Sequence, residues 1–253
     1  MRLDKFLSEK YGSRTKAATA INKGLVLVNG KSVQPSFDLD ESKDNLTFIE
    51  DCESYVSVGG YKLSKAIKDF DFSVDGKVFA DIGASTGGFT DCLLKNGASK
   101  VYCIDVGESQ LDKSLISNKT VIIDNFNARN LHAGLFSDRL DGAVIDVSFI
   151  SLTYVLNAVG EVLEDGASVL ALIKPQFECE SRKVGKNGIV KDKKMHESII
   201  SKIYDFASDC GLSPLKITNA PIIQGKNMEY VILLEKGSKQ QASKEFLIKS
   251  VKL

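Results

Sequence analysis

The chain has 253 residues, 43% of them hydrophobic and 26% charged, which is typical of a water-soluble protein with one large domain or a small and a medium one. It contains no apolar run near the roughly 18 residues that cross a bilayer, no secretory signal at its start, and five scattered cysteines without metal-ligand or redox spacing. From the cysteine pattern we expect a cytoplasmic protein with reduced cysteines and no metal site, and from the absence of a long apolar run we exclude a membrane span. Lys and Arg balance Asp and Glu at 33 each, so the net charge is zero.

Residues 1–55 are predicted to form a small α+β unit with one basic face. Residues 1–33 hold seven Lys or Arg against two acidic residues, whereas residues 34–54 hold one Lys against seven acidic residues. Apolar spacing predicts two short helices before residue 23, and Asn29-Gly30 between apolar runs predicts a β-hairpin. A basic face is typical of a nucleic-acid footprint, although by charge alone an ordinary solvated surface is the simpler interpretation.

Residues 56–60 are predicted as a linker and residues 61–253 as one α/β domain. Gly59-Gly60 suggests a hinge, and the apolar face of Tyr61–Phe72 predicts a helix. Strand and helix patterns then alternate, which predicts a mostly parallel seven-stranded sheet with helices on both faces and an antiparallel hairpin at one edge. The predicted strands are 78–83, 100–106, 120–125, 142–148, 168–174, 214–221 and 228–236, with long helices at 151–163 and 196–211.

A glycine-rich stretch, DIGASTGGFTD, ends the first predicted strand of the α/β domain. Gly83, Gly87 and Gly88 predict a tight strand-to-helix turn where a ligand can approach the backbone. Asp105 ends the next strand 22 positions after Gly83, a separation at which an acidic residue can bind ribose hydroxyls. Ser85 stands where a dinucleotide fingerprint has glycine, so the pattern indicates a nucleoside cofactor without saying which one. The alternative is a purely structural turn.

Four charged residues stand at the ends of predicted elements. Asp146 ends the fourth strand, Lys174 ends the fifth, Glu229 begins the last, and Lys62 lies at the start of the helix before the sheet. Because functional groups gather at the carboxyl ends of parallel strands, we expect these side chains to lie together. The alternative is that each of them only faces solvent.

The stretch RLDKFLSEKYGSRTKAATAINKGLVLVNGKSV resembles the small RNA-binding domain named after ribosomal protein S4. In that family the second helix and the following turn lie on structured RNA, chiefly through phosphate contacts, which position a protein and carry little sequence information. The residues that the resemblance implies for RNA binding are Arg2, Lys5, Ser13, Arg14, Lys16, Lys23 and Lys31.

The words SVGGYKL, DIGASTGGFTD, DVSFISL and KPQFE, together with that N-terminal domain, resemble the TlyA family of bacterial rRNA ribose 2′-O-methyltransferases of the FtsJ type, often labelled hemolysins. The resemblance implies a Rossmann-like fold, S-adenosyl-L-methionine as cofactor, ribosomal RNA or a ribosomal subunit as partner, and a cytidine target. It implies a catalytic tetrad of Lys62, Asp146, Lys174 and Glu229. The cofactor contacts that it implies are Asp81, Gly83, Ala84, Ser85, Thr86, Gly87, Gly88, Phe89, Asp105 and Asn127.

These residue types suit the implied reaction. A ribose hydroxyl is a very weak acid, so a base must take its proton as the methyl group moves from sulfonium to oxygen. Desolvation and a second nearby cation both favour the neutral form of a lysine. We therefore expect Lys174 to be the base, Asp146 to orient it, and Lys62 and Glu229 to position the substrate, in a monomer or weak homodimer. Two alternatives are a membrane-damaging hemolysin and an RNA-binding protein whose second domain is inactive.

Overall fold

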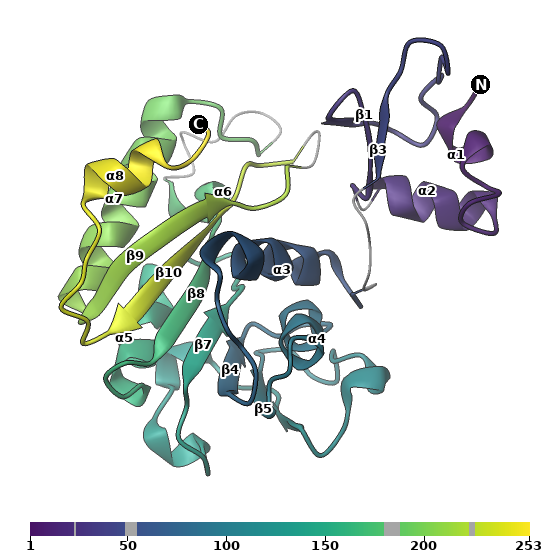
Figure 1. Ribbon diagram of the computed structural model, residues 1–253. Helices are drawn as coiled ribbons and strands as arrows, with labels where there is room; N and C mark the ends of the chain where they lie inside the picture. Colours follow the sequence, from purple (N-terminus) through teal and green to yellow (C-terminus); the bar gives the residue numbers. More distant parts are fainter. Residues whose placement is uncertain (23, 49–54, 180–187, 223–225) are drawn as a thin grey trace. The chain divides into compact units, whose positions relative to one another are not determined.

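The chain folds into two compact units in the computed structural model (Figure 1). One unit is Met1–Ser54 with Pro221–Lys226, and the other is Tyr55–Ala220 with Asn227–Leu253. The residues that the structure describes are 1–22, 24–48, 55–179, 188–222 and 226–253.

The first unit packs two short helices against a three-stranded antiparallel sheet. The predicted tight turn is confirmed, because Asn29 and Gly30 both have positive φ angles, 52° and 74°, as a type I′ hairpin turn requires. A third strand, which sequence reasoning did not predict, pairs with the first strand of the hairpin on the edge away from the second. The elements are α1 (Leu3–Phe6), α2 (Arg14–Asn22), β1 (Val26–Val28), β2 (Lys31–Ser32) and β3 (Leu46–Phe48), with sheet order β2-β1-β3.

The second unit is built on a seven-stranded sheet in the order β6-β5-β4-β7-β8-β10-β9. The first five strands of this order run parallel, and β10 runs antiparallel to both of its neighbours. The predicted Rossmann-like sheet with its antiparallel hairpin is therefore confirmed. The strands are β4 (Val78–Ile82), β5 (Lys100–Ile104), β6 (Thr120–Ile123), β7 (Gly142–Ile145), β8 (Ser168–Ile173), β9 (Leu212–Asn219) and β10 (Tyr230–Lys236).

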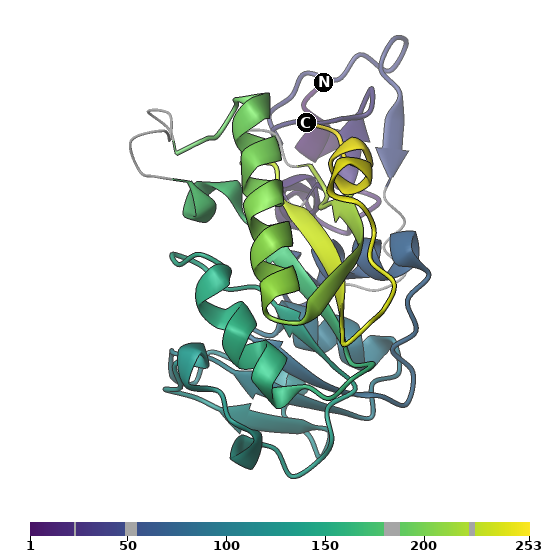
Figure 2. The same cartoon turned by 90° about the vertical axis from the view of Figure 1, so that its left-hand side faces the viewer.

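Helices cover both faces of this sheet, with α3 and α4 on one face and α5, α7 and α8 on the other (Figure 1). In Figure 2 the second face is turned toward the viewer, and α7, in green, lies between α5 and α8 and contacts both. The helices are α3 (Val58–Phe70), α4 (Gly88–Lys95), α5 (Thr153–Val162), α6 (Pro175–Glu178), α7 (Lys193–Asp209) and α8 (Lys244–Lys249), with single 3-10 turns η1 (Lys113–Leu115), η2 (Ala128–Asn130) and η3 (Ala133–Leu135).

The apolar run of β8 is explained by burial on both sides of the sheet. Val169, Ala171 and Ile173 belong to the core cluster under α5 and α7, and Leu170 and Leu172 belong to the cluster under α3 and α4. Successive side chains of a strand point to opposite faces, so a strand covered on both faces needs a continuous apolar sequence. The residue that follows this strand therefore emerges from the core directly at the carboxyl edge of the sheet.

The predicted hinge at Gly59-Gly60 is wrong, because both glycines lie in the first turn of α3, which begins at Val58. A Cβ atom on Gly60 would lie 2.4 Å from the Tyr55 ring and 2.9 Å from the carbonyl oxygen of Gly88. The missing side chain thus permits a close approach of α3 and α4 and does not provide freedom of movement.

The C-terminal tail packs on the second unit. Residues Lys244–Lys249 form α8, and Ser243 caps it by accepting a hydrogen bond from the Phe246 N–H at 3.2 Å. Leu247 and Val251 are buried in the same core cluster as α7. The helix α7 begins at Lys193, three residues before the predicted start of this helix at residue 196, and residues 180–187 lie outside the described ranges.

Candidate active site

Strand register brings the four charged residues to one edge of the sheet. Ile145 pairs with Ala171 in the parallel β7–β8 ladder, so Asp146 and the end of β8 lie on neighbouring strands. In the antiparallel β8–β10 ladder Ile173 pairs with Tyr230, so the residue after β8 stands opposite the residue before β10. A parallel and an antiparallel ladder therefore deliver Asp146, Lys174 and Glu229 to the same place.

Lys174 is the most enclosed of these groups, with 10% of its side chain exposed. Its Nζ lies 2.6 Å from Asp146 Oδ1 and donates a hydrogen bond to Ser148 Oγ at 2.7 Å. A desolvated ammonium is costly unless it is paired and hydrogen-bonded, and these two partners supply both. The loop after β7 thus holds the lysine that follows β8.

Lys62 and Glu229 form a second enclosed ion pair, with 17% and 14% of their side chains exposed. Lys62 Nζ donates to Glu229 Oε2 at 2.6 Å, and Gln176 Nε2 donates to Glu229 Oε1 at 3.0 Å. Both carboxylate oxygens are therefore held, one from α3 and one from α6. The two ion pairs balance two positive charges with two negative charges at the edge of the sheet.

A cavity of about 150 Å³ adjoins Lys174. Gly83 has a φ of +83°, and a Cβ there would lie 2.9 Å from the Asp146 carbonyl oxygen, so only glycine allows this approach. Ser85 also has a positive φ, 47°, and its N–H is held by Asp105 Oδ2 at 2.8 Å. The cavity is lined by Ser57, Gly59, Gly83, Ala84, Ser85, Thr86, Gly88, Phe89, Asp146, Ser148 and Lys174.

Four of the predicted cofactor residues do not line this cavity. Asp105 accepts the N–H groups of Ser85 and Gly107, each at 2.8 Å, and so shapes the turn from the neighbouring strand. Gly87 packs toward η1, and Asn127 is exposed and caps η2. The fourth residue, Asp81, lies beneath the turn.

Asp81 is a fully buried carboxyl. Its Oδ2 accepts a hydrogen bond from Thr90 Oγ1 at 2.6 Å, and its Oδ1 accepts none from the described part of the chain. Burial, with smaller repulsions from Asp146 and Asp105, raises the pKa of Asp81 to about 7. Asp81 thus joins β4 to the first turn of α4 through Thr90, and it is close to losing its charge at neutral pH.

Sequence reasoning missed three side chains that hold the site. Ser148 and Gln176 bond Lys174 and Glu229 directly, and Ser57 lines the cavity from the residue before α3. Each lies in one of the motifs that contain a predicted catalytic residue: Ser57 in SVGGYKL, Ser148 in DVSFISL and Gln176 in KPQFE. The contacts of these polar side chains depend on how two loops pack together, and residue spacing in the sequence does not predict that packing.

In the first unit, two predicted RNA-binding residues share one buried carboxylate. Asp4 Oδ2 lies 2.8 Å from Arg2 Nη2 and 3.1 Å from Arg14 Nε, while both arginines are about half exposed. The hydrogen bond from Arg2, with that from Arg14, holds the pKa of Asp4 well below its usual range. Lys5 and Lys31 are exposed, and Ser13 is half-buried. Lys23 and the side chain of Lys16 lie outside what the structure describes.

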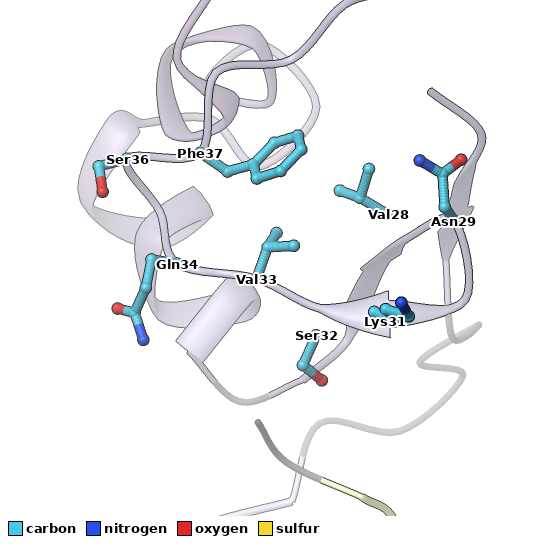
Figure 3. Close-up of a pocket in the computed structure, with 8 residues that line it drawn as sticks. All are labelled: Val28, Asn29, Lys31, Ser32, Val33, Gln34, Ser36 and Phe37. Carbon is cyan, nitrogen blue, oxygen red and sulfur yellow. The ribbon is translucent and has the colours of Figure 1, made fainter. Parts of the chain in front are cut away.

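The first unit also has a hollow of about 480 Å³, shown in Figure 3. Val28, Val33 and Phe37 face into it, whereas Gln34 points away. Lys31 is the one charged side chain among its eight lining residues. The residues that line the hollow include no carboxylate or imidazole for acid–base chemistry.

Neither a membrane helix nor a metal cluster is found within the described ranges. No helix there is long and apolar enough to cross a membrane, and no three His, Cys, Asp or Glu side chains are grouped to hold a metal ion. The four cysteines in those ranges form no disulfide. Cys52 lies outside them.

Comparisons with known proteins match both units. A family model described as FtsJ-like methyltransferase matches residues 55–236, and one described as S4 domain matches residues 1–45. A Brachyspira hyodysenteriae protein named Hemolysin A is 42% identical over 91% of this chain and 98% of its own. A Mycobacterium tuberculosis protein named 16S/23S rRNA (cytidine-2′-O)-methyltransferase TlyA is 35% identical over 88% of this chain and 84% of its own. A solved structure from Streptococcus thermophilus, 36% identical, covers 98% of this chain and 94% of that chain with a TM-score of 0.74.

Proposed function

We propose, since the chain belongs to the FtsJ-like methyltransferase family and carries an S4 domain, that it transfers a methyl group from S-adenosyl-L-methionine to a ribose 2′-hydroxyl of ribosomal RNA. The observation that carries the proposal is the enclosed Lys174, held by Asp146 and Ser148 at the edge of a glycine-lined cavity. The name of the Mycobacterium tuberculosis relative adds cytidine as the target base.

The residues around the cavity fit the cofactor. Gly59, Gly83 and Gly88 leave the backbone bare along its wall, which is what a ligand lying against a strand-to-helix turn requires. Asp105 uses two N–H bonds, and a carboxylate has about four acceptor positions, so it can still accept ribose hydroxyls. Asp146 places a negative charge beside the cavity, which suits a cationic sulfonium. When bound, the cofactor supplies an electrophilic methyl group.

Lys174 takes the proton in this proposal. As a neutral amine it accepts the proton of the 2′-hydroxyl, which makes the oxygen a competent nucleophile. The ammonium that results is already provided with partners, because Asp146 Oδ1 and Ser148 Oγ lie 2.6 and 2.7 Å from Nζ. The enclosure of the side chain keeps water from competing with the ribose. Lys62 and Glu229, held together at 2.6 Å, position the substrate.

The RNA is held from both units in this proposal. In the first unit the exposed arginines and lysines contact phosphates. In the second unit Phe149 is 87% exposed, has a φ of +66°, and its ring centroid lies 5.2 Å from that of Phe177. A positive φ is strained for an aromatic residue, and such strain clusters at functional sites. The exposed Phe149 ring, beside the proposed general base Lys174, is a stacking surface for an unpaired nucleobase.

The test is replacement of Lys174 by alanine and by arginine, with mass mapping of 2′-O-methyl groups in rRNA. Both variants should lose at least about 10²-fold in methyl transfer, because alanine has no base and guanidinium stays protonated. Calorimetric binding of S-adenosyl-L-methionine should persist in both. The exposed Lys68 on the same unit, changed to alanine, is the matched control. A fully active Lys174→Arg variant would exclude Lys174 as the base, and a wild-type protein that neither binds the cofactor nor adds a methyl group would refute the function.

A further inference from the structure

The carboxylate of Glu178 is almost completely enclosed, although it belongs to neither ion pair of the site. Its side chain is 2% exposed. Oε1 accepts the N–H of Leu152 and Oε2 accepts Ser151 Oγ, both at 2.6 Å. The half-exposed Lys202 of α7 adds its Nζ at 3.2 Å from Oε2. A buried carboxylate that is hydrogen-bonded at both oxygens fixes the position of everything bonded to it.

Two partners of Glu178, Ser151 and Leu152, lie on the loop after β7, which also holds Lys174 through Asp146 and Ser148. Glu178 ends α6, four residues after Lys174, and Ser151 stands three residues after Ser148. The two segments are joined by Lys174 with Ser148 at one end and by Glu178 with Ser151 at the other. Between these two contacts Phe177 lies against Phe149. The segment after β8 and the loop after β7 are thus fastened at three successive points.

Neither segment can hold this geometry by itself. The helix α6 has four residues, which is too short to be stable without tertiary contacts. The N-cap residue of α5, Leu152, gives no side-chain cap, so Glu178 provides the acceptor that the first turn of α5 lacks. Glu178 is therefore the last residue of α6 and, through its carboxylate, the hydrogen-bond acceptor at the N-terminus of α5.

We infer that Glu178 is a positioning residue for methyl transfer: it fixes α6 against the loop after β7, and so keeps Lys174 on Asp146 and Ser148 and keeps Phe177 on Phe149. This inference rests on the proposed function. It also makes KPQFE a single unit, in which Lys174 is the base, Gln176 holds Glu229, Phe177 supports the exposed ring, and Glu178 anchors all three.

The experiment compares Glu178→Ala and Glu178→Gln in the full-length protein under saturating cofactor. Glu178→Ala should lower kcat about tenfold to a hundredfold, because a displacement of about 1 Å in a catalytic group costs that much. Cofactor affinity should stay within about twofold, since Glu178 does not line the cavity. Glu178→Gln should recover part of the rate, because its amide oxygen can still accept the Leu152 N–H. A crystal structure of Glu178→Ala should show Lys174 Nζ displaced from Ser148 Oγ.

Two controls separate positioning from general stability. Leu247→Ala removes a fully buried side chain from α8 and should lower the melting temperature with kcat unchanged. Lys202→Gln removes the half-exposed partner and leaves both 2.6 Å hydrogen bonds of Glu178 in place, so kcat should hold. The inference is overturned if Glu178→Ala keeps the wild-type kcat, or if its crystal structure keeps Lys174 on Ser148. A wild-type protein that methylates no ribose refutes the proposed function instead, and the crystal structure then still decides the role of Glu178.

Discussion

Replacing Asp81 by asparagine removes the one fully buried carboxyl under the glycine turn while keeping its shape. The pKa of this group rises from 3.8 to about 7 on folding, so between about pH 4 and pH 7 the folded state keeps a proton that the unfolded state has lost. The free energy of unfolding therefore falls as the pH rises through this window. The slope is about 1.4 kcal/mol per pH unit, which gives about 3 kcal/mol between pH 5 and pH 7.

The measurement is urea unfolding followed by circular dichroism at about pH 5 and about pH 8, because the chain contains no tryptophan to report fluorescence. Wild type should lose about 3 kcal/mol more stability than Asp81→Asn across this interval. Asp4 and Asp138, whose pKa values are lowered by hydrogen bonds from Arg2 and Lys100, titrate below the window and are present in both proteins. Equal losses in the two proteins would show that Asp81 is ionised in the folded state and would refute the burial argument.

Two further substitutions, with Gly59→Ala as the control for the first, test the packing of α3 and the exposed surface at Phe149. Gly60→Ala should lower the free energy of unfolding by about 1–3 kcal/mol, measured by thermal unfolding, because the added Cβ would lie 2.4 Å from Tyr55. Gly59→Ala should lower it little, because the nearest neighbours of the added Cβ lie at 3.4 Å. Equal losses in the two variants would contradict the close approach of α3 and α4. Phe149→Ala should raise KM for RNA about tenfold with cofactor affinity unchanged, because stacking on one base contributes about 1–3 kcal/mol; an unchanged KM would mean that no base stacks there.

The positions of the charged side chains could be predicted because the topology of a parallel sheet determines where its strands end. Asp146 and Lys174 follow strands recognisable from their apolar runs, and neighbouring parallel strands end at the same edge. Glu229 joins them because its strand is antiparallel, so its beginning meets their ends. Those three placements required only strand boundaries and direction.

The supporting contacts could not be predicted because they join loops that are distant in the sequence. Nothing local to Glu178 shows that its partner is Leu152, and nothing local to Gln176 shows that it faces Glu229. The wrong prediction of a hinge at Gly60 has a different cause. Glycine marks both freedom and close packing, and only the neighbouring helix decides between them.

The place of β10 inside the sheet has a consequence for the order of synthesis. This strand is the last of the chain, yet it lies between β8 and β9, so β9 gains its only neighbour in the sheet when Tyr230–Lys236 has been made. Until then one side of β8 has no strand beside it, and Glu229 is missing from the candidate active site. A nascent chain on the ribosome therefore cannot carry out the chemistry until Tyr230–Lys236 has been made, and the methylating activity begins only with a nearly finished chain.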